Sequence, residues 1–276
     1  MILDEILAHK RHEVAERRRA RSLDVLIRSL EGAEASLGGA GGRLPTVGSF
    51  AAALRQPGVS VIAEFKRKSP SGGPLRVGAS ASAIARMYAA NGAATLSVLT
   101  DLAFFGGTDQ DLIEARQASG LPTLRKDFVI DEYQLYEARA LGADAVLLIV
   151  RALTDVELVS FIELARGLGI DAVVETHSEA EVGRALEAGA TIIGVNNRDL
   201  DTLVTDVRLA PRLRPLVPAD CLFVAESGVS SPEQITQLAD AGANAVLVGE
   251  SLLRAADPGE QLRRLVVAGS PRGMVA

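Results

Sequence analysis

The chain has 276 residues, 48% hydrophobic and 23% charged, a length that suits one large domain or two small ones. Its formal net charge of −6 excludes a bulk attraction to nucleic acid or membranes. Aromatic residues make up 4%, tryptophan is absent and no apolar run approaches the ~20 residues that span a bilayer, so neither a basic, aromatic nucleic-acid surface nor a transmembrane helix is expected. The sole cysteine, Cys221, cannot form an internal disulfide, and the N-terminus lacks the apolar core of a signal peptide, so we expect a cytoplasmic protein.

The first element is an amphipathic helix, predicted over residues 1–30 by apolar positions at helical spacing. Its second half is basic, from Lys10 to Arg21. We interpret the basic positions as a solvated helix face, with a patch for an anionic ligand as the alternative. A Gly/Ala-rich stretch at 31–44 predicts a flexible linker. Residues 1–48 therefore form a helical extension with its linker.

After a short helix near residues 50–55, strand-like apolar runs alternate with helix-like segments. The predicted strands are residues 60–66, 94–99, 121–126, 144–150, 171–175, 191–196, 221–226 and 244–249. The predicted helices are residues 79–91, 108–119, 131–141, 154–168, 178–188, 206–214, 231–241 and 250–267. Glycines after four of the helices predict left-handed caps: Gly92, Gly142, Gly189 and Gly242.

Eight strand–helix pairs favour an α/β fold of the (β/α)8 TIM-barrel type over an open doubly wound sheet. No GxGxxG motif follows the first strand, which argues against a dinucleotide-binding fold. We assign residues 49–267 to the barrel and residues 268–276 to a disordered tail.

Polar residues suited to chemistry stand at the strand ends, where barrel active sites lie. Glu64 and Lys66 are two residues apart on the first strand, so their side chains face the same side, near the mouth. The alternative is an interior ion pair that only fills the barrel. Lys126 ends the third strand and Glu175 the fifth, so they can meet across the mouth as an acid and a base. Asn196 ends the sixth strand at equivalent depth.

The loops after the last two strands, ESGVSSPEQ and VGESLLR, predict a phosphate site on backbone N–H groups. Gly228 and Gly249 let the backbone approach an anion. Glu250 should point its carboxylate away and contribute its backbone N–H alone. The loop at 69–73 could close over a substrate. The histidines, including His177, lack metal-ligand spacing, so no metal is predicted.

Eight motifs in order resemble those of the indole-3-glycerol-phosphate synthase family: IAEFKRKSPSGG, SVLTDLAFFGG, LRKDFVID, ADAVLLIV, VVETHSEAE, IGVNNRDL, VAESGV and VLVGESLLR. The resemblance runs from the N-terminal helix to about Leu265. It implies ring closure of 1-(2-carboxyphenylamino)-1-deoxy-D-ribulose 5-phosphate, with loss of carbon dioxide and water, to indole-3-glycerol phosphate in tryptophan biosynthesis. No cofactor is implied, because no redox step occurs.

The resemblance also implies roles. Lys126 is the general acid, Glu175 the general base, Lys66 holds the anionic groups of the substrate and Glu64 orients Lys66. Which lysine donates which proton stays open. The implied polar positioners are Asn196 and Ser227. The implied substrate contacts are Ser69, Phe105, Phe128, Leu147, Arg198, Leu200, Glu226, Gly228, Gly249 and Glu250.

The linker at 31–44 is long and loose for this family, which leaves open whether the extension packs over the barrel mouth. Alternative functions are a phosphoribosylanthranilate isomerase, a tryptophan synthase alpha chain, or a non-catalytic barrel that binds a phosphometabolite. The partner is a small phosphorylated substrate. A closed barrel has no exposed sheet edge, which removes one route to association but not contacts between helix faces. We expect a monomer.

Overall fold

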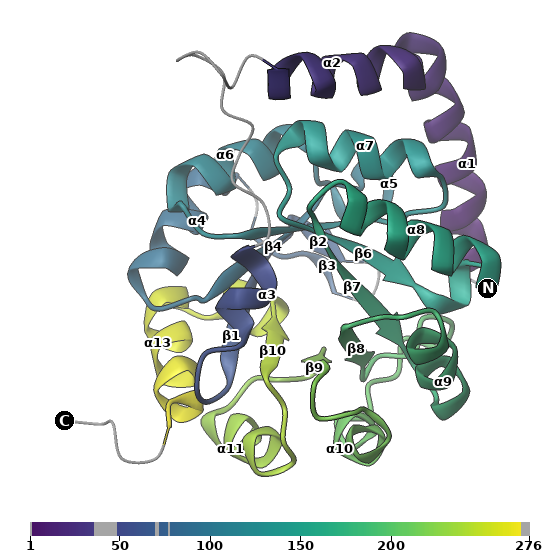
Figure 1. Ribbon diagram of the computed structural model, residues 1–276. Coiled ribbons are helices and arrows are strands. Elements are labelled where there is room, and N and C mark those ends of the chain that lie inside the picture. The colour runs from purple at the N-terminus through teal and green to yellow at the C-terminus, as the bar shows by residue number, and fades with distance from the viewer. Residues whose placement is uncertain (1, 36–48, 70–71, 77, 272–276) are drawn as a thin grey trace.

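The computed structural model describes residues 2–35, 49–69, 72–76 and 78–271 (Figure 1). Eight parallel strands close into a barrel in the order β1-β10-β9-β8-β7-β6-β5-β4, and β4 pairs with β1. Helices surround this barrel, so the predicted TIM-barrel fold is confirmed. None of the helices in the described ranges is long and apolar enough to cross a membrane.

The strands are β1 (Ser60–Phe65), β4 (Thr95–Leu99), β5 (Thr123–Lys126), β6 (Ala145–Ile149), β7 (Asp171–Thr176), β8 (Ile192–Asn196), β9 (Leu222–Glu226) and β10 (Ala245–Val248). The surrounding helices are α4 (Ala81–Ala90), α6 (Asp109–Ser119), α7 (Glu132–Leu141), α8 (Asp155–Gly167), α9 (Glu179–Glu187), α10 (Leu209–Leu213), α11 (Pro232–Asp240), α12 (Glu250–Arg254) and α13 (Pro258–Gly269). Every predicted strand is present, with ends displaced by about one or two residues, as is usual for sequence patterns. The four predicted glycine caps all have positive φ.

Several short elements were not predicted. They are α5 (Leu102–Phe105), the hairpin β2 (Lys68–Ser69) with β3 (Gly73–Pro74), and the 3-10 turns η2 (Val150–Ala152) and η3 (Arg214–Leu216). The predicted helix at 250–267 is wrong, because it is two helices. Asp257 accepts a hydrogen bond from the Glu260 N–H and Pro258 opens α13, so a new helix begins there. The predicted tail is helical as far as Gly269, and residues 272–276 lie outside the described residues.

Every second strand residue points into the barrel, and the residues at these positions are mostly apolar. These inward residues form one cluster: Ile62, Leu124, Ala145, Leu147, Ile149, Val173, Ile192, Leu222, Val224, Ala245 and Leu247. Phe50 and Leu54 of α3 (Ser49–Leu54) pack onto the same cluster, and Leu3 and Ile6 of the N-terminal helix do so as well. A polar residue follows two positions after four of these residues, so its side chain also points inward, at the mouth of the barrel. The four are Ile62, Leu124, Val173 and Val224.

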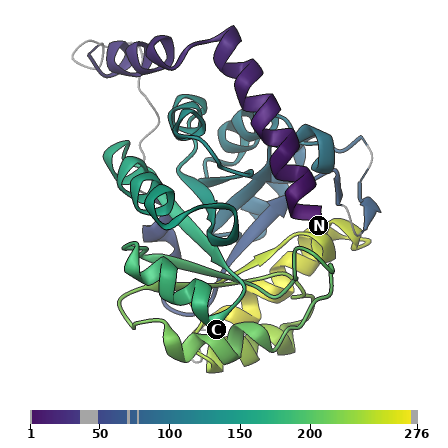
Figure 2. The same cartoon turned by 90° about the vertical axis from the view of Figure 1, so that its right-hand side faces the viewer.

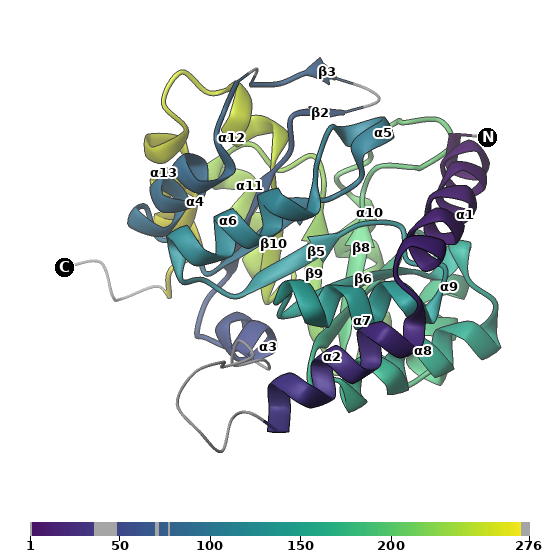
Figure 3. The same ribbon diagram turned by 90° about the horizontal axis from the view of Figure 1, so that it is seen from above.

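The N-terminal extension consists of α1 (Ile2–Ala20) and α2 (Leu23–Ala35), so the single helix predicted over residues 1–30 is wrong. Ser22 accepts a hydrogen bond from the Val25 N–H at 3.4 Å and starts the second helix. Figure 2 shows α1 crossing the face at which the strands end, and Figure 3 shows α2 turning away along α7. The extension therefore packs over the mouth. The predicted linker at 31–44 begins too early, because residues 31–35 are the end of α2; residues 36–44 lie outside the described residues.

The basic half of α1 is a solvated face only in part: Arg11, Arg18, Arg19 and Arg21 are exposed, as predicted, whereas Lys10 and Arg17 are not. Lys10 is 1% exposed. Arg17 forms ion pairs with Asp109 at 2.6 Å and with Glu137 at 3.0 Å, and Arg18 pairs with Asp131 at 2.8 Å. These carboxylates belong to the barrel, so the basic side chains attach the extension to it.

Candidate active site

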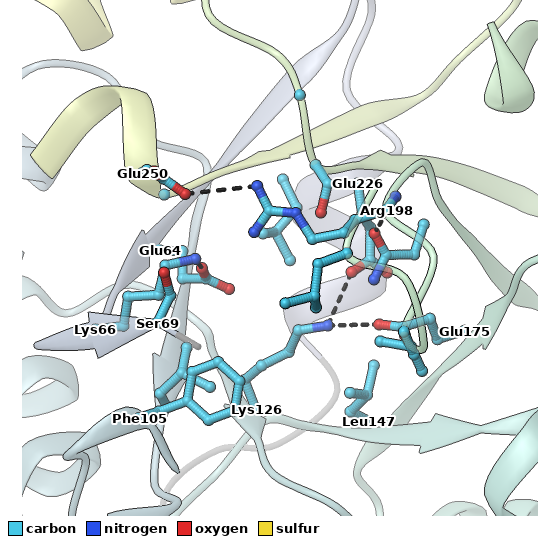
Figure 4. A pocket seen from close by; sticks show the side chains of 18 of the residues that line it. Glu64, Lys66, Ser69, Phe105, Lys126, Leu147, Glu175, Arg198, Glu226 and Glu250 are labelled. Atoms are coloured by element: carbon cyan, nitrogen blue, oxygen red, sulfur yellow. Dashed lines mark hydrogen bonds and ion pairs between the residues drawn. The ribbon is translucent and has the colours of Figure 1, made fainter. Parts of the chain in front are cut away.

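Four charged side chains form one layer at the barrel mouth. These are the last or next-to-last residues of β1, β5, β7 and β9, which alternate around the closed sheet: Glu64, Lys126, Glu175 and Glu226. Layers of four inward side chains from alternate strands are the usual filling of this fold. Lys126 Nζ lies 2.7 Å from Glu175 Oε2 and 2.8 Å from Glu226 Oε2. Figure 4 shows the Lys126 side chain pointing toward Glu175. The predicted meeting of Lys126 and Glu175 is therefore present in the fold.

Burial and neighbouring charges shift the pKa values of these groups in different directions. Burial alone would lower the pKa of Lys126, but Glu175, Glu226 and Glu64 raise it above its usual value. Burial would raise the pKa of Glu175, yet Lys126 and His177 lower it to about 2. Burial raises the pKa of Glu226 to about 7, with Glu175 and Glu64 adding to the increase against the opposing effect of Lys126. The layer thus combines a stable ammonium ion, a stable carboxylate and one carboxyl group that titrates near neutral pH.

Lys66 and Glu64 form the second ion pair of the mouth. Lys66 Nζ lies 2.5 Å from Glu64 Oε1, and Ser97 donates a hydrogen bond to Glu64 Oε2 at 3.3 Å. Gly249 makes room for this carboxylate, because a Cβ there would lie 2.5 Å from Glu64 Oε1. Lys66 is held at the pocket edge, where it can receive an anionic substrate group.

The predicted phosphate loops border the same cavity. Ser227 and Gly228 have φ values of 65° and 81°, a left-handed turn directly after β9. The Glu250 carboxylate lies 3.5 Å from Arg198 Nη2 and 3.0 Å from Arg254 Nε. Its negative charge is therefore held by two arginines, while its backbone lies at the start of α12.

The other side of the cavity is apolar. The rings of Phe105 and Phe128 lie with centroids 6.1 Å apart. Leu147 and Leu200 complete the wall that the sequence predicted. The cavity has a volume of about 320 Å³, and every residue predicted to act or bind lines it, Asn196 and Ser69 included. Of the loop predicted to close over a substrate, residues 70–71 lie outside the described residues.

Several parts of the site were not predicted from the sequence. Ile2, Leu3 and Ile6 of α1 line the cavity, although only their helical spacing was noted. The direct contact between Glu226 and Lys126 was also missed; the signal was that both residues end odd-numbered strands of the barrel, so they share a layer. In the described part of the chain, no group of three or more His, Cys, Asp and Glu side chains is placed to hold a metal ion.

His177 lies behind the general-base candidate rather than in the cavity lining. Its Nε2 is 3.4 Å from Glu175 Oε1 and its Nδ1 is 3.4 Å from Glu181 Oε2. Burial would lower the pKa of His177, but Glu181 and Glu175 raise it above its usual value. A protonated His177 adds to the positive surroundings that keep Glu175 ionised.

Gly194→Ala is expected to disturb the charged layer from below. A Cβ at Gly194 would lie 2.3 Å from Glu226 Oε1, so the carboxylate must move from Lys126. Overpacking of this kind costs ~1–3 kcal/mol of the free energy of unfolding. Misplacement of the charged layer should also lower product formation at least about tenfold. Thermal melts and a product assay would measure both effects.

The matched control is Gly183→Ala on α9, where an added Cβ meets no heavy atom within 4 Å. Replacing a helical glycine by alanine should stabilise the protein by ~0.5–1 kcal/mol. Equal melting temperatures and equal activities for the two variants would contradict the role assigned to Gly194.

Glu226→Gln is expected to stabilise the protein more at pH 8 than at pH 5, relative to wild type. The pKa of Glu226 is about 7 in the folded protein, above the ~4.3 of an exposed glutamate. Between these values the folded state binds more protons than the unfolded state, so this group lowers the free energy of unfolding as the pH rises. Glutamine does not titrate and avoids that loss. Melting curves of both proteins at the two pH values test this, and a pH-independent difference would contradict the raised pKa.

A closed parallel barrel with a paired lysine and carboxylate at its mouth, beside the loops predicted to bind phosphate, is typical of a TIM-barrel enzyme. Residues 3–265 match the sequence profile of indole-3-glycerol phosphate synthase. The chain therefore belongs to the indole-3-glycerol phosphate synthase family, which comprises carboxy-lyases of tryptophan biosynthesis. The predicted family is confirmed.

Several relatives match over nearly the whole chain. The indole-3-glycerol phosphate synthase of Kineococcus radiotolerans is 46% identical over 269 residues, which cover 98% of this chain and 96% of that protein. Indole-3-glycerol phosphate synthase 2 of Streptomyces coelicolor is 52% identical over 222 residues, which cover 80% and 86%.

Solved structures at low identity share the barrel fold alone. A 3-hexulose-6-phosphate synthase has a TM-score of 0.60 at 16% identity, covering 76% of this chain and 99% of the other. A mutant tryptophan synthase alpha-subunit from Pyrococcus furiosus has a TM-score of 0.56 at 17% identity, with the same coverage. The tryptophan synthase alternative therefore receives support only at the level of the fold.

Proposed function

We propose that the cavity at the barrel mouth closes the indole ring of 1-(2-carboxyphenylamino)-1-deoxy-D-ribulose 5-phosphate, using Lys126 as general acid and Glu175 as general base. The observation that carries this assignment is the Lys126 ammonium ion, which is held between the buried carboxylates of Glu175 and Glu226. The protonated lysine is a donor for the substrate carbonyl, and the ionised glutamate is an acceptor beside it.

The cavity has two ends of opposite character, which orient the substrate. The aromatic ring of the substrate fits the apolar end, at Phe105, Phe128, Leu147 and Leu200. The phosphate fits the loops of Gly228, Gly249 and Glu250, with Arg198 beside them. The substrate carboxylate lies toward Ser69 and Lys66. Such an orientation brings the aryl carbon against the ketone near Lys126.

The reaction then proceeds in three stages. The aryl carbon attacks the ketone carbon while Lys126 protonates the ketone oxygen. The carboxylate leaves as carbon dioxide, and its bonding electrons restore the aromatic ring. The new hydroxyl leaves as water after taking a second proton, while Glu175 removes a proton from the adjacent carbon. One more proton is consumed than released, and Lys66, oriented by Glu64, is the second ammonium ion at the site.

Asn196 and Ser227 act as polar positioners in this proposal. Both line the cavity, and Asn196 accepts a hydrogen bond from the Arg198 backbone N–H at 3.1 Å. This bond ties the end of β8 to the loop that carries Arg198 and Leu200. We further propose a monomer of the cytoplasm that needs no cofactor, and size-exclusion chromatography and assay after chelator treatment test two of these points.

The decisive test is product formation by the purified protein. The protein is mixed with the carboxyphenylamino-deoxyribulose phosphate, and the indole product is followed by fluorescence. Stoichiometric release of carbon dioxide separates this reaction from a mere isomerisation. Absence of product from folded protein would refute the proposed function and leave a phosphate-binding barrel.

A further inference from the structure

Lys10 of α1 is buried among carboxylates that belong mostly to the barrel. Its Nζ lies 2.9 Å from Asp101 Oδ2, 2.9 Å from Asp127 Oδ1 and 2.8 Å from Glu13 Oε2. The Lys10 side chain is 1% exposed, and the two aspartates are equally inaccessible. Charges that are removed from water this completely require close pairing.

The two aspartates hold the segments that carry the reacting lysine and the aromatic walls. Asp127 directly follows Lys126, and its Oδ1 accepts a hydrogen bond from the Phe128 N–H at 2.8 Å. Asp101 caps α5 by accepting a hydrogen bond from the Phe104 N–H at 2.7 Å. Lys10 is therefore the cation that joins the end of β5 to α5.

Removal of this cation would leave two buried carboxylates without their shared partner. Burial would raise the pKa of Asp127, but Lys10 and Arg125 lower it to about 2, so the group is ionised in the folded protein. Without Lys10, Asp127 keeps the hydrogen bond from the Thr100 hydroxyl at 2.6 Å and Arg125 at 3.7 Å, but no cation then holds it beside Asp101, so we expect the two carboxylates to move apart. Because Asp127 adjoins Lys126 in the chain, such movement shifts the base of the Lys126 side chain relative to Glu175.

We propose that Lys10 is a positioning residue of the reaction, which fixes the Lys126–Phe128 segment against α5 so that the N-terminal extension completes the active site. This inference rests on the proposed function. It differs from a covering role of α1, which Ile2, Leu3 and Ile6 can supply through apolar contact alone. A cover affects substrate binding, whereas misplacement of the reacting lysine affects the chemical step.

The test compares Lys10→Met with Arg18→Met in the full chain. Methionine keeps the length of the lysine side chain and removes its charge. Arg18 lies on the same helix and pairs with Asp131 at 2.8 Å, with 40% of its side chain exposed, so its variant removes a surface attachment only. Lys10→Met should lower kcat at least about tenfold with KM within about threefold, because small displacements of reacting groups are costly. Arg18→Met should leave both constants near wild type.

Three results would lead to other conclusions. A rise in KM at unchanged kcat would overturn the proposal and leave α1 as a cover. Wild-type constants in a folded Lys10→Met variant would also overturn it. A wild-type protein that forms no product would instead refute the proposed function itself, before any variant is compared.

An Asp101→Asn background keeps the test informative if Lys10→Met does not fold. The double variant has one buried negative charge fewer than Lys10→Met alone, so less charge is left without a partner. Lys10→Met should still lower kcat by at least about threefold relative to Asp101→Asn alone, because Asp127 keeps its need for a cation. Equal kcat values for Asp101→Asn and the double variant would overturn the proposal.

Discussion

Lys126→Met should reduce the rate of indole formation by about 10³-fold or more, since general acid catalysis contributes ~10²–10⁴-fold and the ammonium ion also orients the carboxylates. Methionine keeps much of the side-chain volume but has no proton to donate. The loss should appear in single-turnover experiments, where product release does not contribute. A residual rate above about one tenth of wild type would contradict the role of Lys126 as the general acid.

The same substitution leaves Glu175 and Glu226 buried without their common cation, so a loss of folding must be separated from a loss of chemistry. Breaking a buried pair from one side costs ~3–5 kcal/mol. The matched control is the double variant Lys126→Met with Glu226→Gln, which removes one of the two unpaired charges. We expect it to recover melting temperature without recovering activity. Recovery of activity in the double variant would show that folding, not proton donation, was lost.

Glu175→Gln should lower kcat by at least about 10²-fold while KM changes little, because the amide keeps the shape of the carboxylate but cannot accept the proton. Glu175 is 1% exposed, and Lys126 holds its pKa at about 2. Its ionisation therefore cannot produce a fall in activity near neutral pH. A change of kcat near pH 7 in the wild type should come from Glu226 and disappear in Glu226→Gln.

Glu181→Gln is the matched control for this prediction. Glu181 makes the same approach to His177 as Glu175 does, at 3.4 Å, but it lies on α9 and does not line the cavity. The identical chemical change there should alter kcat by less than about threefold, as for a group outside the reacting set. If Glu181→Gln were as damaging as Glu175→Gln, the effect of either substitution would reflect the surroundings of His177 and not proton abstraction.

Most of the fold was predictable because the relevant signals are local. Apolar runs of strand length, each followed by a helical pattern, depend on neighbouring residues only, and so does a glycine cap such as Gly142. The helix boundaries that were wrong also had local signals, at Ser22 and at Asp257 with Pro258. The family motifs carried the site residues, and the fold places each of them on the cavity wall.

The pairing of Lys126 with Glu175 was predicted, but the contact of Lys126 with Glu226 was not, because these residues come from distant parts of the chain. Lys126 and Glu226 are 100 residues apart in sequence and 2.8 Å apart in space. The burial of Lys10 and the pairing of Arg17 were also not predicted, since nothing near either residue in sequence shows that barrel carboxylates will contact them. Net charge and composition are identical in either case.

The sequence by itself determined the strand–helix alternation and the residue types at the strand ends, because both follow from side-chain periodicity and local backbone preference. Only the tertiary structure decided that Glu226 joins Lys126 and Glu175, and in which protonation state these groups lie. Closure of the barrel places Glu64, Lys126, Glu175 and Glu226 in one layer and buries the three carboxylates. Coulombic interactions are strong at that distance and burial, so the pKa values of the two glutamates beside Lys126 separate to about 2 and about 7.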